Sequence, residues 1–151
     1  MQNRSIYGSD HVLFRENARR FFREELEPNI EQWEKDGVVP KGFWRKAGEN
    51  GFLCCGVPEE YGGPGADFLY NMALSEETGY AIGGASVGFS VSADIVAYYL
   101  MNAGTEAQKH KWLPKMVTGE VIAAIGMTEP GAGSDLKAIR TSAVRDGDEY
   151  V

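Results

Sequence analysis

The first 119 residues of the chain carry hydrophobic positions at helical spacing. Between Phe14 and Phe22 the apolar side chains recur three and four residues apart and charged side chains fill the opposite face, which predicts an amphipathic helix capped by Ser9 or Asp10. Similar patterns, separated by glycines and prolines, predict a bundle of five to six helices. The later helices are expected at residues 29–35, around Phe43, Trp44 and Ala47, at 69–80, at 87–99 and, after a Thr105–Gln108 capping box, at 105–117.

The pattern changes after Gly119. Residues 121–128 form an apolar run that favours a β-strand, and a glycine-rich stretch, Glu129–Asp135, follows it. Residues 141–145 then alternate apolar and polar side chains and precede Asp146-Gly147, a strong hairpin signal. A returning strand is therefore expected at the end of the chain.

Together the two patterns predict a mainly α chain with two domains. Residues 1–120 form an amino-terminal helical bundle, and residues 121–151 form the truncated start of a β-barrel-like domain. Only four residues remain after the expected turn for the second strand of the hairpin, and a strand that short at a chain end is marginal. The chain is therefore expected to be a piece of a longer protein.

Composition and charge narrow the function classes. With 43% hydrophobic residues the chain can bury a core, and its formal charge of −7 and pI near 4.9 argue against nucleic acid or anionic lipid as a partner. The most apolar stretch, residues 83–101, contains Asp94 and several small residues, so a buried helix is favoured over a membrane span. The adjacent Cys54 and Cys55 are poorly placed for a disulfide, which favours a reducing compartment.

The residues best suited to bind a ligand lie within Ile125–Asp135 (IGMTEPGAGSD). Met127 offers an apolar wall, Thr128 a hydroxyl donor and the glycine-rich turn its backbone amides. A flat, partly polar cofactor ring needs that combination. A strand followed by a tight polar turn, with no ligand, accounts for the same residue types about equally well.

The same stretch resembles the signature of the acyl-CoA dehydrogenase family. Three upstream blocks resemble this family's amino-terminal helical domain in the same order and spacing. The sequence as a whole is most similar to the long-chain type within the family. Four ordered blocks over nearly the whole chain argue against a chance match. The upstream blocks are Phe14–Pro28 (FRENARRFFREELEP), Gly56–Gly65 (GVPEEYGGPG) and Gly104–Gly119 (GTEAQKHKWLPKMVTG).

The resemblance implies a fold, a cofactor and a set of binding residues. In the family, the helical domain precedes a middle β-domain, here starting near Val121, and a carboxy-terminal helical bundle that this chain lacks. FAD is the implied cofactor. Ile125 departs from the family pattern, because relatives often carry an aromatic residue at this position against the flavin ring. Ser134 is expected to contact the acyl-CoA as well as the cofactor. The expected cofactor contacts are Ile125, Met127, Thr128, Gly133 and Ser134; Phe89, Ser90 and Asp94, on the long apolar helix, are expected to border the pocket for the acyl tail.

The implied reaction removes two hydrogens from a saturated acyl-CoA. A carboxylate takes the α-proton while the β-hydrogen passes as hydride to the flavin, and hydrogen bonds to the thioester carbonyl stabilise the developing charge. In the family that carboxylate comes from the carboxy-terminal domain, so no catalytic residue is assigned here and the chain alone is expected to be inactive. The implied partners are an acyl-CoA substrate, an electron-transferring flavoprotein and further copies of the full-length chain. The implied compartment is a bacterial cytoplasm or a mitochondrial matrix.

Other motifs are weaker. Residues 84–88 (GASVG) fit a nucleophile motif with Ser86, but a helical segment precedes them where that motif needs a strand. Residues 131–136 (GAGSDL) lack the third glycine of a dinucleotide fingerprint. The two histidines, His11 and His110, have no zinc-ligand spacing to the cysteines, so no metal site is expected.

Two further sets of residues are expected to be structural. Neighbouring helix positions point about 100° apart, so Glu76 and Glu77 cannot face one substrate and are expected to form a solvated edge. The aromatic series Trp33, Phe43, Trp44, Phe52 and Tyr61 is expected to form core. The alternative hypothesis for the whole chain is a non-catalytic helical binding module that keeps the bundle and has no chemistry.

Overall fold

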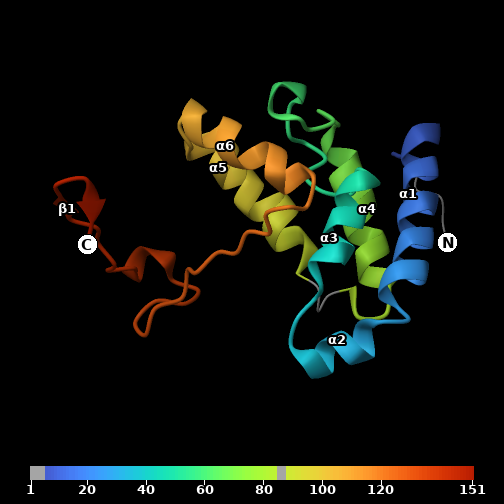
Figure 1. The fold of residues 1–151 in the computed structure, drawn as a ribbon, viewed down its shortest axis with the longest axis horizontal. Coiled ribbons are helices and arrows are strands. Elements are labelled where there is room, and N and C mark those ends of the chain that lie inside the picture. The colour runs from blue at the N-terminus through green and yellow to red at the C-terminus, as the bar shows by residue number, and fades with distance from the viewer. Residues whose placement is uncertain (1–5, 85–87) are drawn as a thin grey trace.

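The chain folds into a helical bundle from which an irregular carboxy-terminal segment extends. The computed structural model describes residues 6–84 and 88–151, and within them lie six α-helices and one two-stranded sheet, which confirms the mainly α fold class. Figure 1 shows α1 beside α4 and α5 beside α6, with the residues after α6 running away from the helices. The bounds are α1 Ser9–Phe21, α2 Ile30–Asp36, α3 Lys41–Glu49, α4 Phe68–Tyr80, α5 Ala97–Ala103, α6 Glu106–Val117, β1 Arg145–Asp146 and β2 Glu149–Tyr150, with π-helical turns at Phe22–Leu26 and Val91–Val96 and 3-10 turns at Glu59–Tyr61 and Leu136–Ala138.

The ends of the helices follow the sequence signals closely. Thr105 and Gln108 form the predicted capping box of α6, with the Gln108 amide donating to Thr105 Oγ1 at 3.3 Å and the Thr105 amide donating to Gln108 Oε1 at 2.9 Å. Helix α1 begins at Ser9 with Gly8 as its cap, so the prediction of Ser9 or Asp10 as the cap is wrong by one or two residues. The Gly8 amide donates to His11 Nδ1 at 3.2 Å, so the side chain of the third helical residue satisfies the cap's own N–H, as a glutamate or glutamine does in a capping box.

Aromatic side chains from several helices make the core of the bundle. Phe22 and Leu113 are almost fully buried, and the Trp44 ring stacks on Phe89 with the ring centroids 5.4 Å apart. Burying a side chain of this size stabilises the fold by about 1.5–3 kcal/mol relative to leaving it exposed. The predicted aromatic core is confirmed: Phe43, Trp44, Phe52 and Tyr61 are buried and Trp33 packs against the cluster.

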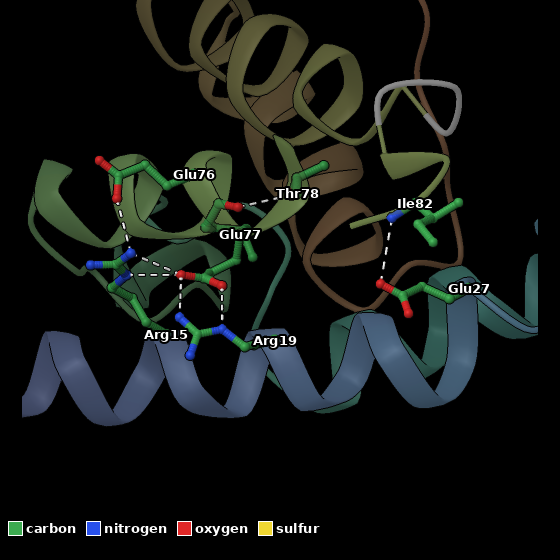
Figure 2. Close-up of polar contacts among 8 residues, drawn as sticks. Arg15, Arg19, Glu27, Glu76, Glu77, Thr78 and Ile82 are labelled. Carbon is green, nitrogen blue, oxygen red and sulfur yellow. Dashed lines mark hydrogen bonds and ion pairs between the residues drawn. The ribbon is translucent and has the colours of Figure 1, made fainter. Parts of the chain in front are cut away.

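Two arginines of α1 enclose a buried glutamate of α4 (Figure 2). Arg15 Nη2 lies 2.9 Å from Glu77 Oε1, Arg19 Nε lies 2.8 Å from Glu77 Oε2, and the Glu77 side chain is 0% exposed. Glu76 reaches the same Arg15 at 3.1 Å. The predicted solvated edge at Glu76 and Glu77 is therefore wrong, because the turn between neighbouring helix positions points Glu77 into the α1 interface and leaves Glu76 at its margin. Pairing with arginine offsets the desolvation of the buried carboxylate.

The carboxy-terminal segment contains less sheet than its sequence indicates. Residues 121–128, predicted as a strand, have no strand structure, because an apolar run becomes a strand only where another backbone pairs with it. The hairpin at the end of the chain is confirmed: Asp146 pairs with Glu149, and the two-residue loop is Gly147-Asp148, one position later than expected. Gly147 has φ of 61°, a conformation that favours glycine in such loops.

Candidate functional site

The chain leaves the bundle at a tightly packed glycine. Gly119 has φ of 72°, and a Cβ there would lie 2.2 Å from the carbonyl oxygen of Trp44, so no larger residue fits without moving backbone. A few residues later, the amide of Ala123 donates to Ser92 Oγ at 3.0 Å. Ser92 lies in the π-helical turn Val91–Val96, so this turn and the first residues of the segment are held together.

The five candidate cofactor-binding residues follow on one accessible stretch, residues 125–134. Ile125 is 38% exposed, Thr128 is exposed and Met127 is half-buried. Gly133 and Ser134, on the far side of the intervening turn, are also exposed, and a Cβ at Gly133 would meet nothing within 4 Å. A ligand can therefore approach both the side chains before the turn and the backbone after it.

A tight turn separates the two halves of this stretch. Glu129 and Ala132 exchange backbone hydrogen bonds of 2.9 and 3.1 Å, and Ala132 is buried. Asp135 then accepts a hydrogen bond from the amide of Lys137 at 3.2 Å and opens the short 3-10 turn Leu136–Ala138. Local hydrogen bonds, rather than apolar burial, thus shape the glycine-rich loop.

The carboxylate of Glu129 belongs to the same set of contacts. Hydrogen bonds from the side chain of Thr141 and from the amides of Arg140 and Thr141 hold the pKa of Glu129 below its usual range. The group is therefore ionised at neutral pH and acts as an acceptor toward residues 140–141.

A partly open cavity of about 200 Å³ lies between α4 and the residues around the start of the π-helical turn. Phe89, Ser90 and Asp94 all line it, so the structure groups the three residues that were expected to border an acyl tail. Helix α4 supplies the opposite wall. The remaining lining residues are Leu74, Ser75, Thr78, Gly79, Gly84 and Gly88.

One wall of this cavity contains a half-buried carboxyl group. Burial raises the pKa of Asp94, and a 2.5 Å hydrogen bond from Asn71 Nδ2 to its Oδ1 opposes that rise. Burial, together with the nearby Asp94, also raises the pKa of the Cys54 and Cys55 thiols to about 12. The two thiols are therefore neutral at physiological pH and behave as small apolar side chains.

Sequence reasoning missed three residues that shape the stretch 125–134 and the cavity beside the π-helical turn. Ser92 and Asn71 are isolated polar residues within apolar helical patterns, and both are buried. That mismatch is a usable signal, since buried polar side chains need partners. Glu129 lies inside the glycine-rich motif, but nothing in its sequence neighbourhood points to residues 140–141.

The weaker motifs find little structural support. Ser86, the serine of the nucleophile-like motif, lies outside the described residues. His110 is exposed, and its ring packs against Tyr61 with the ring centroids 5.0 Å apart. Across residues 6–84 and 88–151, no group of three His, Cys, Asp or Glu side chains is arranged to hold a metal ion. Nor does this described part contain a helix with the length and apolarity needed to cross a membrane.

Comparison with known proteins gives consistent matches. The family profile described as "Acyl-CoA dehydrogenase, N-terminal domain" matches residues 8–120. The mitochondrial long-chain specific acyl-CoA dehydrogenase of Rattus norvegicus is 45% identical over 148 residues, which cover 98% of this chain and 34% of the rat protein. This chain thus spans about a third of the length of the curated relatives it matches.

Solved structures give the same result. An acyl-CoA dehydrogenase from Geobacillus kaustophilus superposes with a TM-score of 0.89 at 51% identity, covering 99% of this chain and 39% of that one. An acyl-CoA dehydrogenase from Bacillus anthracis, solved in complex with FAD, superposes with a TM-score of 0.85 at 33% identity, covering 94% of this chain and 24% of that one. The likeness therefore includes the irregular segment as well as the bundle.

Proposed function

The chain belongs to the acyl-CoA dehydrogenase family, and on this premise we propose that it is the amino-terminal part of an FAD-dependent enzyme that dehydrogenates acyl-CoA thioesters between the α and β carbons. The observation that supports this most directly is the accessible stretch 125–134, which brings apolar side chains, hydroxyl groups and backbone hydrogen-bond donors together in one place. The coverage of about a third of the relatives supports its origin in a longer protein. The similarity to long-chain enzymes favours a long acyl substrate.

Residues 125–134 have the chemistry that a flavin ring requires. Half-buried Met127 and exposed Ile125 can cover an apolar face, the Thr128 hydroxyl can donate to a ring heteroatom, and Gly133 leaves room for close approach to the backbone. A bound flavin supplies the hydride acceptor. In this proposal the chain's own residues hold and orient that acceptor, and Ser134 contacts both the cofactor and the acyl-CoA, donating its single hydroxyl hydrogen to one of them.

The cavity beside Val91–Val96 is the proposed site for the acyl tail. Phe89 gives it an apolar wall, and Ser90 and Asp94 stand at its polar side. Because burial raises the pKa of Asp94, the uncharged form of this carboxyl is favoured more than it would be in water. An alkyl chain then packs against a neutral group rather than against a charge.

The catalytic base is proposed to come from a part of the protein outside this chain. Glu77 is held by two arginines, Glu76 pairs with Arg15, and Glu129 accepts hydrogen bonds from residues 140–141. A general base needs a free lone pair directed at the substrate and a pKa near the working pH. All three carboxylates are already engaged by partners within the chain, so residues 1–151 alone are expected to show no turnover.

Partners, a domain boundary and a compartment are also proposed, on the basis of the reaction and of the relatives. Two-electron reduction of a flavin needs an onward electron acceptor, for which an electron-transferring flavoprotein is proposed, and the full-length chain is proposed to form a homo-oligomer. The domain boundary is placed near residue 120, which the end of the family match at 120 and the packed Gly119 support. A bacterial cytoplasm or a mitochondrial matrix suits relatives from both sources.

The test is made on the parent-length protein. After gentle isolation or addition of FAD it should show flavin absorbance and oxidise acyl-CoA with an artificial electron acceptor. Thr128→Ala should weaken flavin retention, whereas Thr118→Ala, which changes an exposed threonine on α6's carboxyl end, should not. A parent-length protein that stays colourless would contradict the proposal and favour a non-catalytic helical module.

A further inference from the structure

We propose that Glu129 is a positioning residue, whose carboxylate fixes the glycine-rich loop so that Thr128 and Ser134 are presented to cofactor and thioester together. The inference rests on the proposed function, because it assigns a role within the same site. It concerns the Glu129 cluster, defined here as Glu129, Arg140 and Thr141. These three residues join the two ends of the loop that contains Ser134.

Both carboxylate oxygens of Glu129 are engaged. Oε2 accepts a hydrogen bond from the Arg140 amide at 2.9 Å, and Oε1 accepts one from the Thr141 amide, also at 2.9 Å. Oε1 additionally accepts a short hydrogen bond from the Thr141 hydroxyl. Charge-assisted bonds of this kind are stronger than neutral ones. Three donors from two consecutive residues thus converge on one side chain.

The backbone of Glu129 is fixed by a separate pair of hydrogen bonds. It bonds to Ala132 in both directions, which closes the turn that follows Thr128. One residue therefore ties the start of the loop to its own turn through the backbone and to residues 140–141 through the side chain. Ser134 lies between these two attachment points.

Little else orders this part of the chain. Ala132 is the one buried residue between positions 129 and 141, and the loop contains Gly131 and Gly133, which add backbone freedom. The 3-10 turn Leu136–Ala138 is only three residues long. Because apolar packing is nearly absent, the hydrogen bonds of the Glu129 cluster are the main restraint on where Ser134 lies.

The geometry requires a carboxylate of glutamate length. An amide at this position would keep an oxygen for Thr141 but turn an N–H₂ donor toward the Arg140 amide, which is itself a donor. Alanine would leave all three donors to water. Glu129→Gln should therefore have an intermediate effect and Glu129→Ala the largest.

The experiment uses the parent-length flavoprotein with its FAD bound. In Glu129→Ala, KM for acyl-CoA should rise roughly tenfold while kcat changes less, because misplaced binding groups weaken substrate positioning. Thr141→Val should give a smaller rise in KM, and Thr141→Ser, which keeps the hydroxyl, should restore the wild-type value. Glu120→Gln, at an exposed glutamate just before the segment, serves as the charge control and should leave KM unchanged.

Hydrogen exchange and thermal unfolding complete the test. The amides of residues 129–141 should exchange faster in Glu129→Ala, with the thermal midpoint unchanged, because the cluster lies outside the bundle. An unchanged KM together with unchanged exchange would overturn the inference, as would a lowered thermal midpoint with KM intact, the result expected of a purely structural residue. If the wild-type protein binds no flavin, the proposed function fails, and the exchange measurement still decides whether Glu129 orders the loop.

Discussion

The helical bundle and the segment after it are held together by different forces. Residues up to Gly119 surround a continuous aromatic and aliphatic core, whereas in residues 121–151 only Ala132 is buried. The segment relies instead on hydrogen bonds accepted by the carboxylates of Glu129 and Asp135 and on the backbone hydrogen bonds of the terminal hairpin. The part that is held by apolar packing therefore differs from the part that offers the proposed cofactor contacts, which is held mainly by hydrogen bonds.

The same large-to-small change in the two regions should separate them most clearly. Phe22→Ala removes a ring that contacts Phe21 and Phe89 in the core and should lower the free energy of unfolding by about 4 kcal/mol. Ile125→Ala, in the segment, should lower it by less than about 1 kcal/mol, because Ile125 is 38% exposed. Urea unfolding of the 151-residue chain, followed by far-ultraviolet circular dichroism, measures both. Similar losses would contradict the division into a packed bundle and an unpacked segment.

A buried charge should matter more than an exposed one within the bundle. Glu77→Ala leaves Arg15, whose side chain is 8% exposed, without its principal partner and should cost about 3 kcal/mol of stability. Glu31→Ala breaks an exposed ion pair with Lys35 and should change stability by less than about 0.5 kcal/mol.

A double variant sharpens this second prediction. Arg15→Met combined with Glu77→Leu removes the two most buried charges of the cluster and leaves Arg19, whose side chain is 36% exposed, to solvent. The double variant should recover most of the loss of Glu77→Ala, because an apolar pair of similar volume avoids desolvation of the charges. Urea midpoints for the three variants provide the measurement. If the double variant is less stable than Glu77→Ala, the buried pair stabilises the bundle more than apolar packing can.

The helices were predictable because their signals are local. The spacing of Phe14 to Phe22 and the Thr105–Gln108 capping box depend only on neighbours in sequence, and both gave the correct element. The Glu76–Glu77 prediction failed because the partner residues, Arg15 and Arg19, lie on another helix. Periodicity assigns a face to a residue but does not reveal what a neighbouring helix presents to that face.

The segment and the candidate site were predictable only in part. The hairpin was found because its turn chemistry is local, whereas residues 121–128 have strand composition and no strand, since no described backbone pairs with them. The stretch 125–134 was identified by its residue types and by family resemblance. The contacts of Ser92, Asn71 and Glu129 depend on the tertiary fold, and their partners lie 31, 23 and 11–12 residues away in the sequence.

The junction between the two regions should be sensitive to a single methyl group. Gly119→Ala places a Cβ against the Trp44 carbonyl at a positive φ and should destabilise the chain by about 2 kcal/mol. Gly147→Ala is the matched control, because Gly147 also has a positive φ but an added Cβ meets nothing within 4 Å. It should leave the unfolding midpoint of the bundle unchanged. Equal midpoints for the two variants would show that packing at the junction contributes nothing.

The smallest expected effect concerns Asp94 and depends on pH. Because burial raises the pKa of this carboxyl in the folded state, the folded chain holds the proton more tightly than the unfolded chain does. Stability from this group is therefore fully present below the ordinary aspartate pKa of about 4 and is lost as pH rises through the higher folded-state pKa. The charged form then has to be accommodated beside Asn71, Cys54 and Cys55.

Asp94→Asn removes this titration and keeps an oxygen that can accept from Asn71. The variant should gain stability relative to wild type as pH rises from about 4 to 7, with the two proteins closest at the acidic end. Urea unfolding of both proteins at a series of pH values measures the difference, and Asp36→Asn, at an exposed position of α2, controls for the change in net charge. A difference that is constant with pH, or that grows toward acid, would mean that Asp94 is stabilised as a carboxylate. The cavity wall would then present a charge, and an alkyl tail would be a poor occupant of it.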